Sequence, residues 1–158
     1  MSRAVTILVG TMTGTADLVA QDMAPVLQGR GHDVDVVAMD NLGPDVFARD
    51  SLFVICTSTY GQGDVPDNAM AFFSRLESER PDLSAVSFGV FAMGDRTYAD
   101  TFCFGGKRFA SLLESLGAHR IGDVFCHDAS AGTIPEEVGA AWVAEWIATA
   151  TETREACR

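Results

Sequence analysis

Basic side chains are scarce in this sequence. Only 11 Lys and Arg residues stand against 22 Asp and Glu, which gives a formal net charge of −11. Proteins that bind nucleic acid owe much of their affinity to basic side chains on phosphates, so this balance argues against such a partner. The acidic charge is compatible with docking on a partner protein that has a basic face, although solubility alone would also explain it.

Cysteines and long apolar runs are also few. None of the four cysteines lies in a CxxC pair or at metal-ligand spacing, and Cys56 falls in the apolar run SLFVICTS, where we expect a buried, reduced thiol. The longest apolar runs are too short to span a membrane. The apolar start of the chain is too short for a signal peptide and lacks a cleavage pattern. We therefore expect a cytoplasmic protein without a membrane partner.

Patterns for hydrolysis and for triphosphate binding are missing. The three histidines, His32, His119 and His127, show no ligand-like spacing and no identifiable partner. The chain has no Cys-x5-Arg loop after its first apolar run, no GxxxxGK[ST] loop and no GxGxxG. These absences predict no metal site and no catalytic residues of a hydrolase.

What the sequence does contain is a regular alternation of apolar strand patterns and amphipathic helix patterns. Its 158 residues, 47% hydrophobic, predict one domain over residues 1–150 and a polar tail over 151–158 that frays. The predicted strands cover residues 4–9, 33–39, 52–57, 86–93 and 121–126, and the predicted helices cover 16–27, the segment between 67 and 80, 102–116 and 135–149. The apolar faces of the first two helices are expected to include Leu18 and Met70. Such alternation is typical of an α/β fold whose parallel sheet is covered by helices on both faces.

The segment from Ala4 to Ala16 joins the first strand to the first helix through a threonine-rich loop. The first turn of a helix has N–H groups without helical partners, and its dipole favours an anion. Threonine hydroxyls add donors, and Gly14 allows close approach of the backbone to a phosphate. Because the loop lacks Lys and Arg, it suits a single terminal monophosphate. The alternative is an ordinary strand-to-helix turn in which Thr15 caps the helix.

Four loops follow the carboxyl ends of the predicted strands, where open parallel sheets bind ligands. They span residues 11–16, 58–64, 93–102 and 127–133. Two of them carry a tyrosine, Tyr60 and Tyr98, whose rings could enclose a flat heterocycle. A flat ring tethered to a phosphate describes flavin mononucleotide (FMN), although each tyrosine could instead pack on the domain edge. Acidic residues in these loops would lower the potential of a second, anionic reduction of a flavin.

Three segments resemble the signature regions of flavodoxins: TMTGTA, STYGQGDVPDNA and MGDRTYADTFCFGGKRFASLLESLGA. They are most similar to the MioC-type short-chain flavodoxins and to the FMN domains of cytochrome P450 reductase and sulfite reductase. The resemblance extends from about residue 4 to residue 150. It implies a flavodoxin-like three-layer αβα sandwich with a five-stranded parallel sheet in the order 2-1-3-4-5, the fold that general accounts of the strand-order rule take as an example.

The resemblance also implies a set of residues that bind FMN. The phosphate would lie on Thr11, Met12, Thr13, Gly14, Thr15 and Ala16. One side of the isoalloxazine would be lined by Ser58, Thr59, Tyr60 and Gly61, and the other by Met93, Gly94, Asp95, Tyr98, Phe102 and Cys103, with Asp128 near the ribityl chain or the ring edge.

The implied function is one-electron transfer by a stand-alone, monomeric carrier. Electrons would come from an NAD(P)H-dependent flavodoxin reductase and pass to an acceptor enzyme with a basic docking face. Two alternatives stay open: an FMN-dependent NAD(P)H quinone or flavin reductase, and a receiver-like binding module without a cofactor. The receiver-like alternative requires acidic residues after the first strand, where this chain has threonines.

Overall fold

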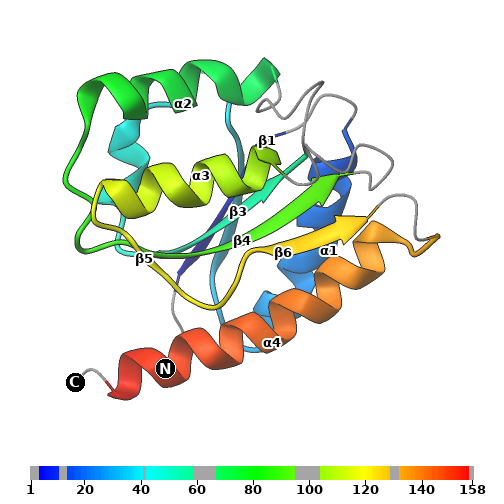
Figure 1. The fold of residues 1–158 in the computed structure, drawn as a ribbon. Helices are drawn as coiled ribbons and strands as arrows, with labels where there is room; N and C mark the ends of the chain where they lie inside the picture. The colour runs from blue at the N-terminus through cyan, green and yellow to red at the C-terminus, as the bar shows by residue number, and fades with distance from the viewer. Residues whose placement is uncertain are drawn as a thin grey trace.

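The computed structural model describes residues 4–10, 14–40, 42–58, 67–94, 104–128 and 132–156. Within them, six strands form one parallel sheet in the order β2-β1-β3-β4-β5, and β6 also pairs with β4 (Figure 1). The strands are β1 (Val5–Gly10), β2 (Val34–Ala38), β3 (Leu52–Thr57), β4 (Ser87–Gly94), β5 (His119–Arg120) and β6 (Phe125–Asp128). The predicted α/β fold and its strand order are confirmed.

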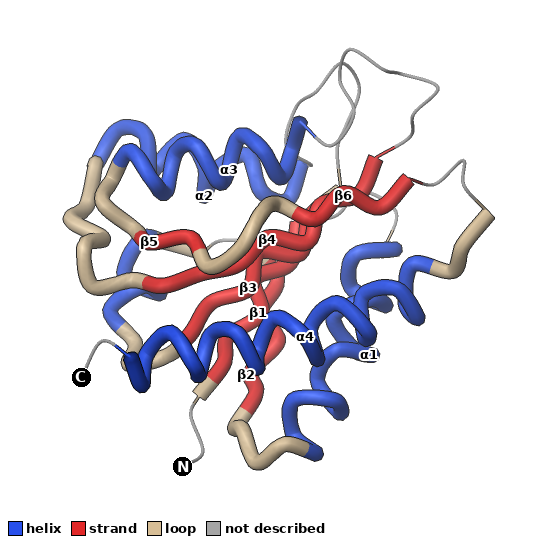
Figure 2. Tube along the Cα trace, turned by 60° about the horizontal axis from the view of Figure 1, so that its bottom comes forward, coloured by secondary structure: helices blue, strands red, loops and turns tan. Residues whose placement is uncertain are grey.

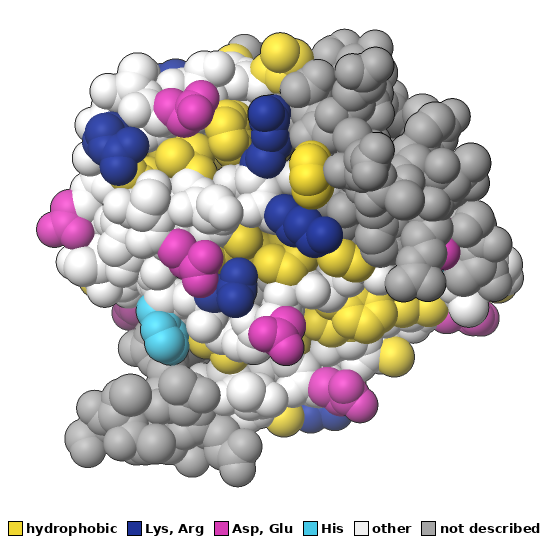
Figure 3. Space-filling model, viewed as in Figure 1, with side chains coloured by type: hydrophobic (Ala, Val, Ile, Leu, Met, Phe, Trp, Pro, Cys, Tyr) yellow, Lys and Arg dark blue, Asp and Glu magenta, His cyan; other side chains and the backbone are white. Residues whose placement is uncertain are grey.

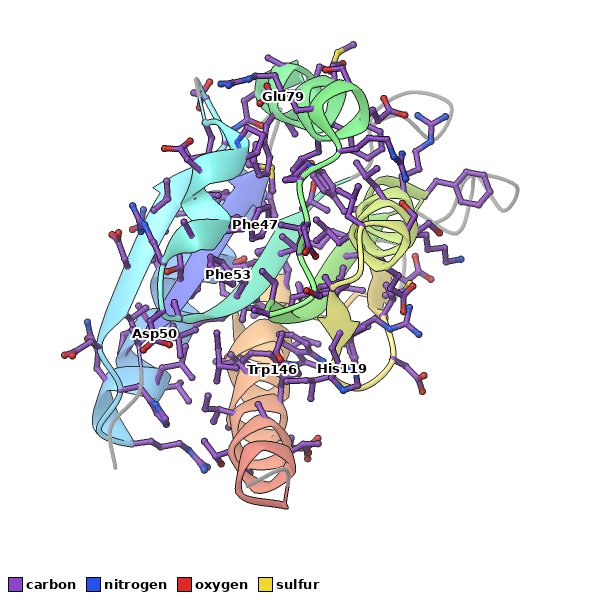
Figure 4. The ribbon with its side chains drawn as sticks, turned by 90° about the vertical axis from the view of Figure 1, so that its left-hand side faces the viewer. Phe47, Asp50, Phe53, Glu79, His119 and Trp146 are labelled. Atoms are coloured by element: carbon purple, nitrogen blue, oxygen red, sulfur yellow. The ribbon has the colours of Figure 1, made fainter. Side chains whose placement is uncertain are left out.

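Helices cover both faces of the sheet (Figure 2). α1 (Thr15–Gly29) and α4 (Pro135–Ala156) lie on one face, and α2 (Asp67–Glu79), α3 (Phe104–Ser115) and the short 3-10 helix η1 (Pro44–Ala48) lie on the other. All residues of β1 and β3 are buried, which explains why both read as continuous apolar runs. On the α2 side, Phe47 of η1 packs on Phe53 of β3 with ring centroids 4.9 Å apart (Figure 4).

The last part of the sheet differs from the prediction of one strand over residues 121–126, because the structure has two short strands, β5 and β6. β5 pairs with Ser87 and Phe88, and β6 pairs with residues 91–94. The four residues between β5 and β6 (121–124) therefore correspond to only two residues of β4 (89 and 90). The indole N–H of Trp146 donates to the Ile121 carbonyl at 3.1 Å (Figure 4), and the ring occupies the space where a side chain on Gly89 would begin. The indole N–H thus bonds to a carbonyl oxygen that, in a continuous strand, would accept a hydrogen bond from the neighbouring strand.

Two predicted core residues are exposed. Leu18 is 54% exposed and Met70 is 51% exposed. The buried stripe of α1 consists of Ala16, Val19, Ala20, Met23 and Leu27, and Leu18 falls outside this 3.6-residue period. The prediction that both residues lie on apolar faces was wrong.

The predicted polar tail is largely helical, because α4 continues to Ala156. The hydroxyl of Thr151 donates to the Ile147 carbonyl at 2.9 Å, so the polar side chain bonds within its own helix. Trp142 and Trp146, one turn apart in α4, stack on each other with ring centroids 5.9 Å apart. None of the described helices combines the length and apolar composition needed to span a membrane.

Candidate functional site

The amino ends of all four α-helices and the carboxyl ends of β1, β3, β4 and β6 face the same edge of the molecule, which we call the rim (Figure 1). The structure describes seven of the predicted site residues there: Gly14, Thr15, Ala16, Ser58, Met93, Gly94 and Asp128. The other ten lie outside the described residues, and their roles stay predictions: Thr11, Met12, Thr13, Thr59, Tyr60, Gly61, Asp95, Tyr98, Phe102 and Cys103.

The amino end of α1 begins at a glycine in the left-handed region. Gly14 has φ 91° and ψ −4° and occupies the N-cap, so Thr15 is the first helical residue and not the cap. The first intrahelical bond runs from the Leu18 N–H to the Gly14 carbonyl at 3.1 Å. The N–H groups of Ala16 and Asp17 therefore precede the first hydrogen bond of the helix. Apart from Gly14 itself, its chain neighbours and the backbone of α1, no atom of the described residues lies within 4 Å of the point where a side chain on Gly14 would begin. The space that the described residues leave beside Gly14 therefore lies at the positive end of the helix dipole.

The exits of β1 and β3 are joined to each other. The Ser58 N–H donates to the Gly10 carbonyl at 3.0 Å, which extends the β1–β3 ladder beyond Thr57. Space between the strands is tight, since a Cβ on Gly10 would lie 2.7 Å from the Thr57 hydroxyl oxygen. The last described residues of the two strand ends, Gly10 and Ser58, therefore lie side by side at the edge of the sheet.

The exits of β4 and β6 are likewise paired. Met93 is in register with His127, and Gly94 with Asp128. Gly94 and Asp128 are half-buried, whereas Met93 is only 6% exposed and belongs to the core under α1 and α4. This placement leaves little of the Met93 side chain for a ligand and puts Asp128 directly beside Gly94.

His127 has a structural partner that was not predicted from the sequence. This histidine is buried, its Nε2 lies 2.9 Å from the Thr133 hydroxyl oxygen, and its ring stacks on Phe91 at 6.4 Å. The contact ties the end of β6 to the segment before α4. No local pattern in the sequence signals it.

Large exposed hydrophobic side chains gather at the helix starts. Among the described residues, they are Leu18 in α1, Met70 in α2, Phe104 in α3 and Ile134 just before α4. Lys107 lies over the Phe104 ring, with Nζ 5.8 Å from its centroid. Further apolar side chains follow β6 between α3 and α4 (Figure 3). A domain that exposes apolar side chains in one region commonly uses them for contact with other molecules.

Cys56, the buried cysteine of β3, is not accessible from the rim. Cys56 is fully buried in β3, and its Sγ lies 3.5 Å from the Ala16 carbonyl oxygen. Burial, with a smaller effect of the Asp17 charge, raises the pKa of this thiol well above its ordinary value. The thiol is therefore neutral and inert at physiological pH, as expected from the sequence.

Comparison with known proteins assigns this chain to a family. The sequence profile described as Flavodoxin matches residues 7–142. The chain belongs to the flavodoxin family. Flavodoxins are flavoproteins that carry electrons and typically bind FMN.

Individual relatives agree with this assignment. Flavodoxin YqcA of Pectobacterium carotovorum subsp. carotovorum is 38% identical over 140 residues, which cover 89% of this chain and 92% of that protein. Protein MioC of Escherichia coli (strain K12) is 31% identical over 145 residues, covering 90% and 95%. The sulfite reductase [NADPH] flavoprotein alpha-component of Bacillus subtilis is 38% identical over 122 residues, covering 77% of this chain and 20% of that protein.

A solved structure confirms the architecture. A cysteine-to-serine mutant of flavodoxin from Pseudomonas aeruginosa matches this flavodoxin with a TM-score of 0.82 at 31% identity, covering 92% of this chain and 97% of that one. The resemblance to MioC-type flavodoxins and to the sulfite reductase flavoprotein, first visible in three short segments, thus extends over most of the fold.

Proposed function

We propose that this flavodoxin binds one FMN at the rim and passes single electrons from an NAD(P)H-dependent reductase to an acceptor enzyme. The observation that carries the proposal is that α1 begins at Gly14, with its positive dipole end on the same edge as the exits of β3, β4 and β6. A monophosphate and a flat ring attached to it need an anion site and adjoining loops, and the rim supplies both.

The donors at the rim fit a phosphate monoester. The α1 amino end offers backbone amides, and Thr15 and Ser58 add hydroxyls, while the described residues from 14 to 29 contain no Lys or Arg. Neutral donors and a helix dipole together stabilise a phosphate anion without a metal ion. We assign the phosphate to the segment from Thr11 to Ala16.

The ring would lie over the exits of β3 and β4. In this proposal, residues 58–61 line one side and residues 93–103 line the other, with Tyr60 and Tyr98 against its faces and Asp128 near its edge. The described ends of these segments support the assignment, since Ser58 adjoins β1 and Gly94 pairs with Asp128. The bound FMN supplies the one-electron chemistry, and the chain orients it and limits its contact with water.

In this proposal, the redox partners dock on the acidic surface of α1 and α4, next to the exposed apolar side chains at the rim. The described side chains of α1 and α4 include five acidic residues and no basic ones: Asp17, Asp22, Glu136, Glu137 and Glu145. Exposed Leu18 and Ile134 lie at the rim end of these two helices. A partner with a basic face would be attracted by the charge, and the apolar side chains would add short-lived contact near the flavin.

A charge substitution at Gly14 tests the proposed function. In Gly14→Asp, a carboxylate would meet the phosphate, and we expect FMN affinity to fall by about a hundredfold or more. Gly14→Asn has nearly the same shape without the charge and should lose much less. Fluorescence titration of the apoprotein with FMN measures both.

A second glycine provides a matched control. Gly31 has φ 89°, close to that of Gly14, and also has open space where a side chain would begin, but it lies beyond the other end of α1. Gly31→Asp should therefore bind FMN like the wild type. Equal FMN affinity of Gly14→Asp and Gly14→Asn would contradict the phosphate assignment.

A further inference from the structure

Asn68, the second residue of α2, bonds to the ends of two neighbouring strands. Its Nδ2 donates to the Val9 carbonyl at 3.2 Å and to the Asp40 carboxylate, at Oδ2, at 3.3 Å. A side-chain amide nitrogen carries two hydrogens, so each acceptor takes one of them. The side chain of Asn68 therefore joins α2 to β1 and to the turn after β2.

The contact lies immediately before the proposed phosphate segment. Val9 is two residues ahead of Thr11, and its carbonyl also accepts the Met39 N–H at 2.9 Å. On the next residue, a Cβ at Gly10 would lie 3.3 Å from the Cβ of Ala69. The first turn of α2 thus packs against the last two residues of β1, where the chain leaves the sheet.

We propose that Asn68 is a positioning residue for the phosphate segment. By holding the Val9 carbonyl, it fixes the direction in which the chain leaves β1 and so places the amides that follow. Asn68 acts through β1 and is not itself assigned to contact with FMN. This inference rests on the proposed function, because it concerns the same phosphate.

Asparagine is specifically suited to this position. Aspartate has almost the same shape, but its carboxylate only accepts hydrogen bonds. At position 68 it would face two acceptors, the Val9 carbonyl oxygen and the Asp40 carboxylate. The first turn of a helix favours a carboxylate, so Asn68→Asp is expected to retain α2 while losing the bond to Val9.

The test compares FMN with riboflavin, which has the same ring and no phosphate. We expect Asn68→Asp to weaken FMN binding by about tenfold or more, in keeping with the loss of one hydrogen bond to a shielded acceptor. Riboflavin binding should weaken by less than about threefold. Both affinities are measured by fluorescence titration of the same apoprotein, with thermal unfolding recorded in parallel.

The double variant Asp40→Asn/Asn68→Asp separates the two bonds. It exchanges donor and acceptor between positions 40 and 68, so the contact between them can form again, while the donor to Val9 stays absent. We expect the double variant to recover thermal stability but not FMN affinity. Asp40→Asn alone keeps an oxygen acceptor for Asn68 and should bind FMN no more weakly than the wild type.

Three results would overturn the inference: unchanged FMN affinity in Asn68→Asp, equal weakening of FMN and riboflavin, or recovery of FMN affinity in the double variant. Each of these requires a wild-type protein that binds FMN. A wild type that binds neither FMN nor riboflavin would instead overturn the proposed function, and this inference with it.

Discussion

At the scale of single residues, Gly10 is a position at the rim with little room for a side chain. It lies at the exit of β1, between Thr57 of β3 and Ala69 of α2. A methyl group there would contact the Thr57 hydroxyl oxygen and would also approach the Met39 sulfur at 3.3 Å. Packing therefore favours glycine as the last residue of β1, which directly precedes the proposed phosphate segment.

We expect Gly10→Ala to destabilise the fold by about 1–3 kcal/mol, because overpacking at a buried site forces its neighbours to move. Urea unfolding followed by circular dichroism measures the change. Thr57→Ala removes the contacting hydroxyl, so the cost of Gly10→Ala should be smaller in that background. Gly29, at the end of α1, has open space instead, and Gly29→Ala should be neutral or slightly stabilising.

His32 should make stability depend on pH. Burial, followed by nearby positive charges that include Arg30, lowers the pKa of His32 from its ordinary value of 6.5. The folded state therefore disfavours the proton, and the unfolded state binds more protons below pH 6.5. Stability is fully present above that pH and is lost as the pH falls toward the lowered pKa of the folded state.

The variant His32→Gln removes this titration. Between about pH 7.5 and about pH 5.5, we expect the wild type to lose more free energy of unfolding than His32→Gln does. Urea unfolding at both pH values gives the comparison. Identical losses in the two proteins would show that His32 does not contribute to the pH dependence.

Residue-scale contacts of this kind were the hardest to predict. The contact made by Asn68 was not predicted, because its acceptor Val9 is 59 residues away along the chain. The partner of His127 was missed although Thr133 is only six residues away, since no local pattern predicts that these two side chains meet in the folded chain. Periodicity identifies which residues are apolar, but not which polar groups meet after folding.

At the scale of elements, the break between β5 and β6 depends on α4. Trp146 enters the space left by Gly89 and donates to the Ile121 carbonyl. Periodicity predicted a single strand over 121–126 because Ile121, Val124 and Phe125 are apolar. The break arises from a residue about 25 positions later in the chain, which no local window includes.

We expect Trp146→Phe to cost about 2–4 kcal/mol, because it leaves the Ile121 carbonyl without its donor and opens a cavity beside Gly89. Trp142→Phe, one turn earlier in α4, changes a half-buried ring and should cost clearly less. Urea unfolding of both variants provides the measurement. A smaller loss for Trp146→Phe than for Trp142→Phe would contradict this account of the break.

Most of the element order was nevertheless predictable. β1, β3 and β4 are buried apolar runs between loops, and their predicted bounds differ from the structure by a residue or two. The errors at Leu18 and Met70 have a different origin. Both residues are apolar yet exposed in the first turns of helices at the rim, and apolar character alone does not tell a buried position of a helix from an exposed one.

At the scale of the whole molecule, the net charge of −11 should control association with partners. For the FMN-loaded, reduced protein, we expect electron transfer to a basic c-type cytochrome to slow by about tenfold as salt rises from about 10 to about 200 mM. Transfer to ferricyanide, a small anion, should become faster over the same range. Stopped-flow kinetics measures both, and the same direction of change with the two acceptors would contradict the electrostatic account.

We propose that the rim holds FMN by the amides at the start of α1 and uses it to carry single electrons. The decisive measurement is an anaerobic spectroelectrochemical titration of the purified protein. We predict a flavin spectrum, one FMN per chain and reduction in two separable one-electron steps. A colourless protein that takes up no added FMN would contradict the claim.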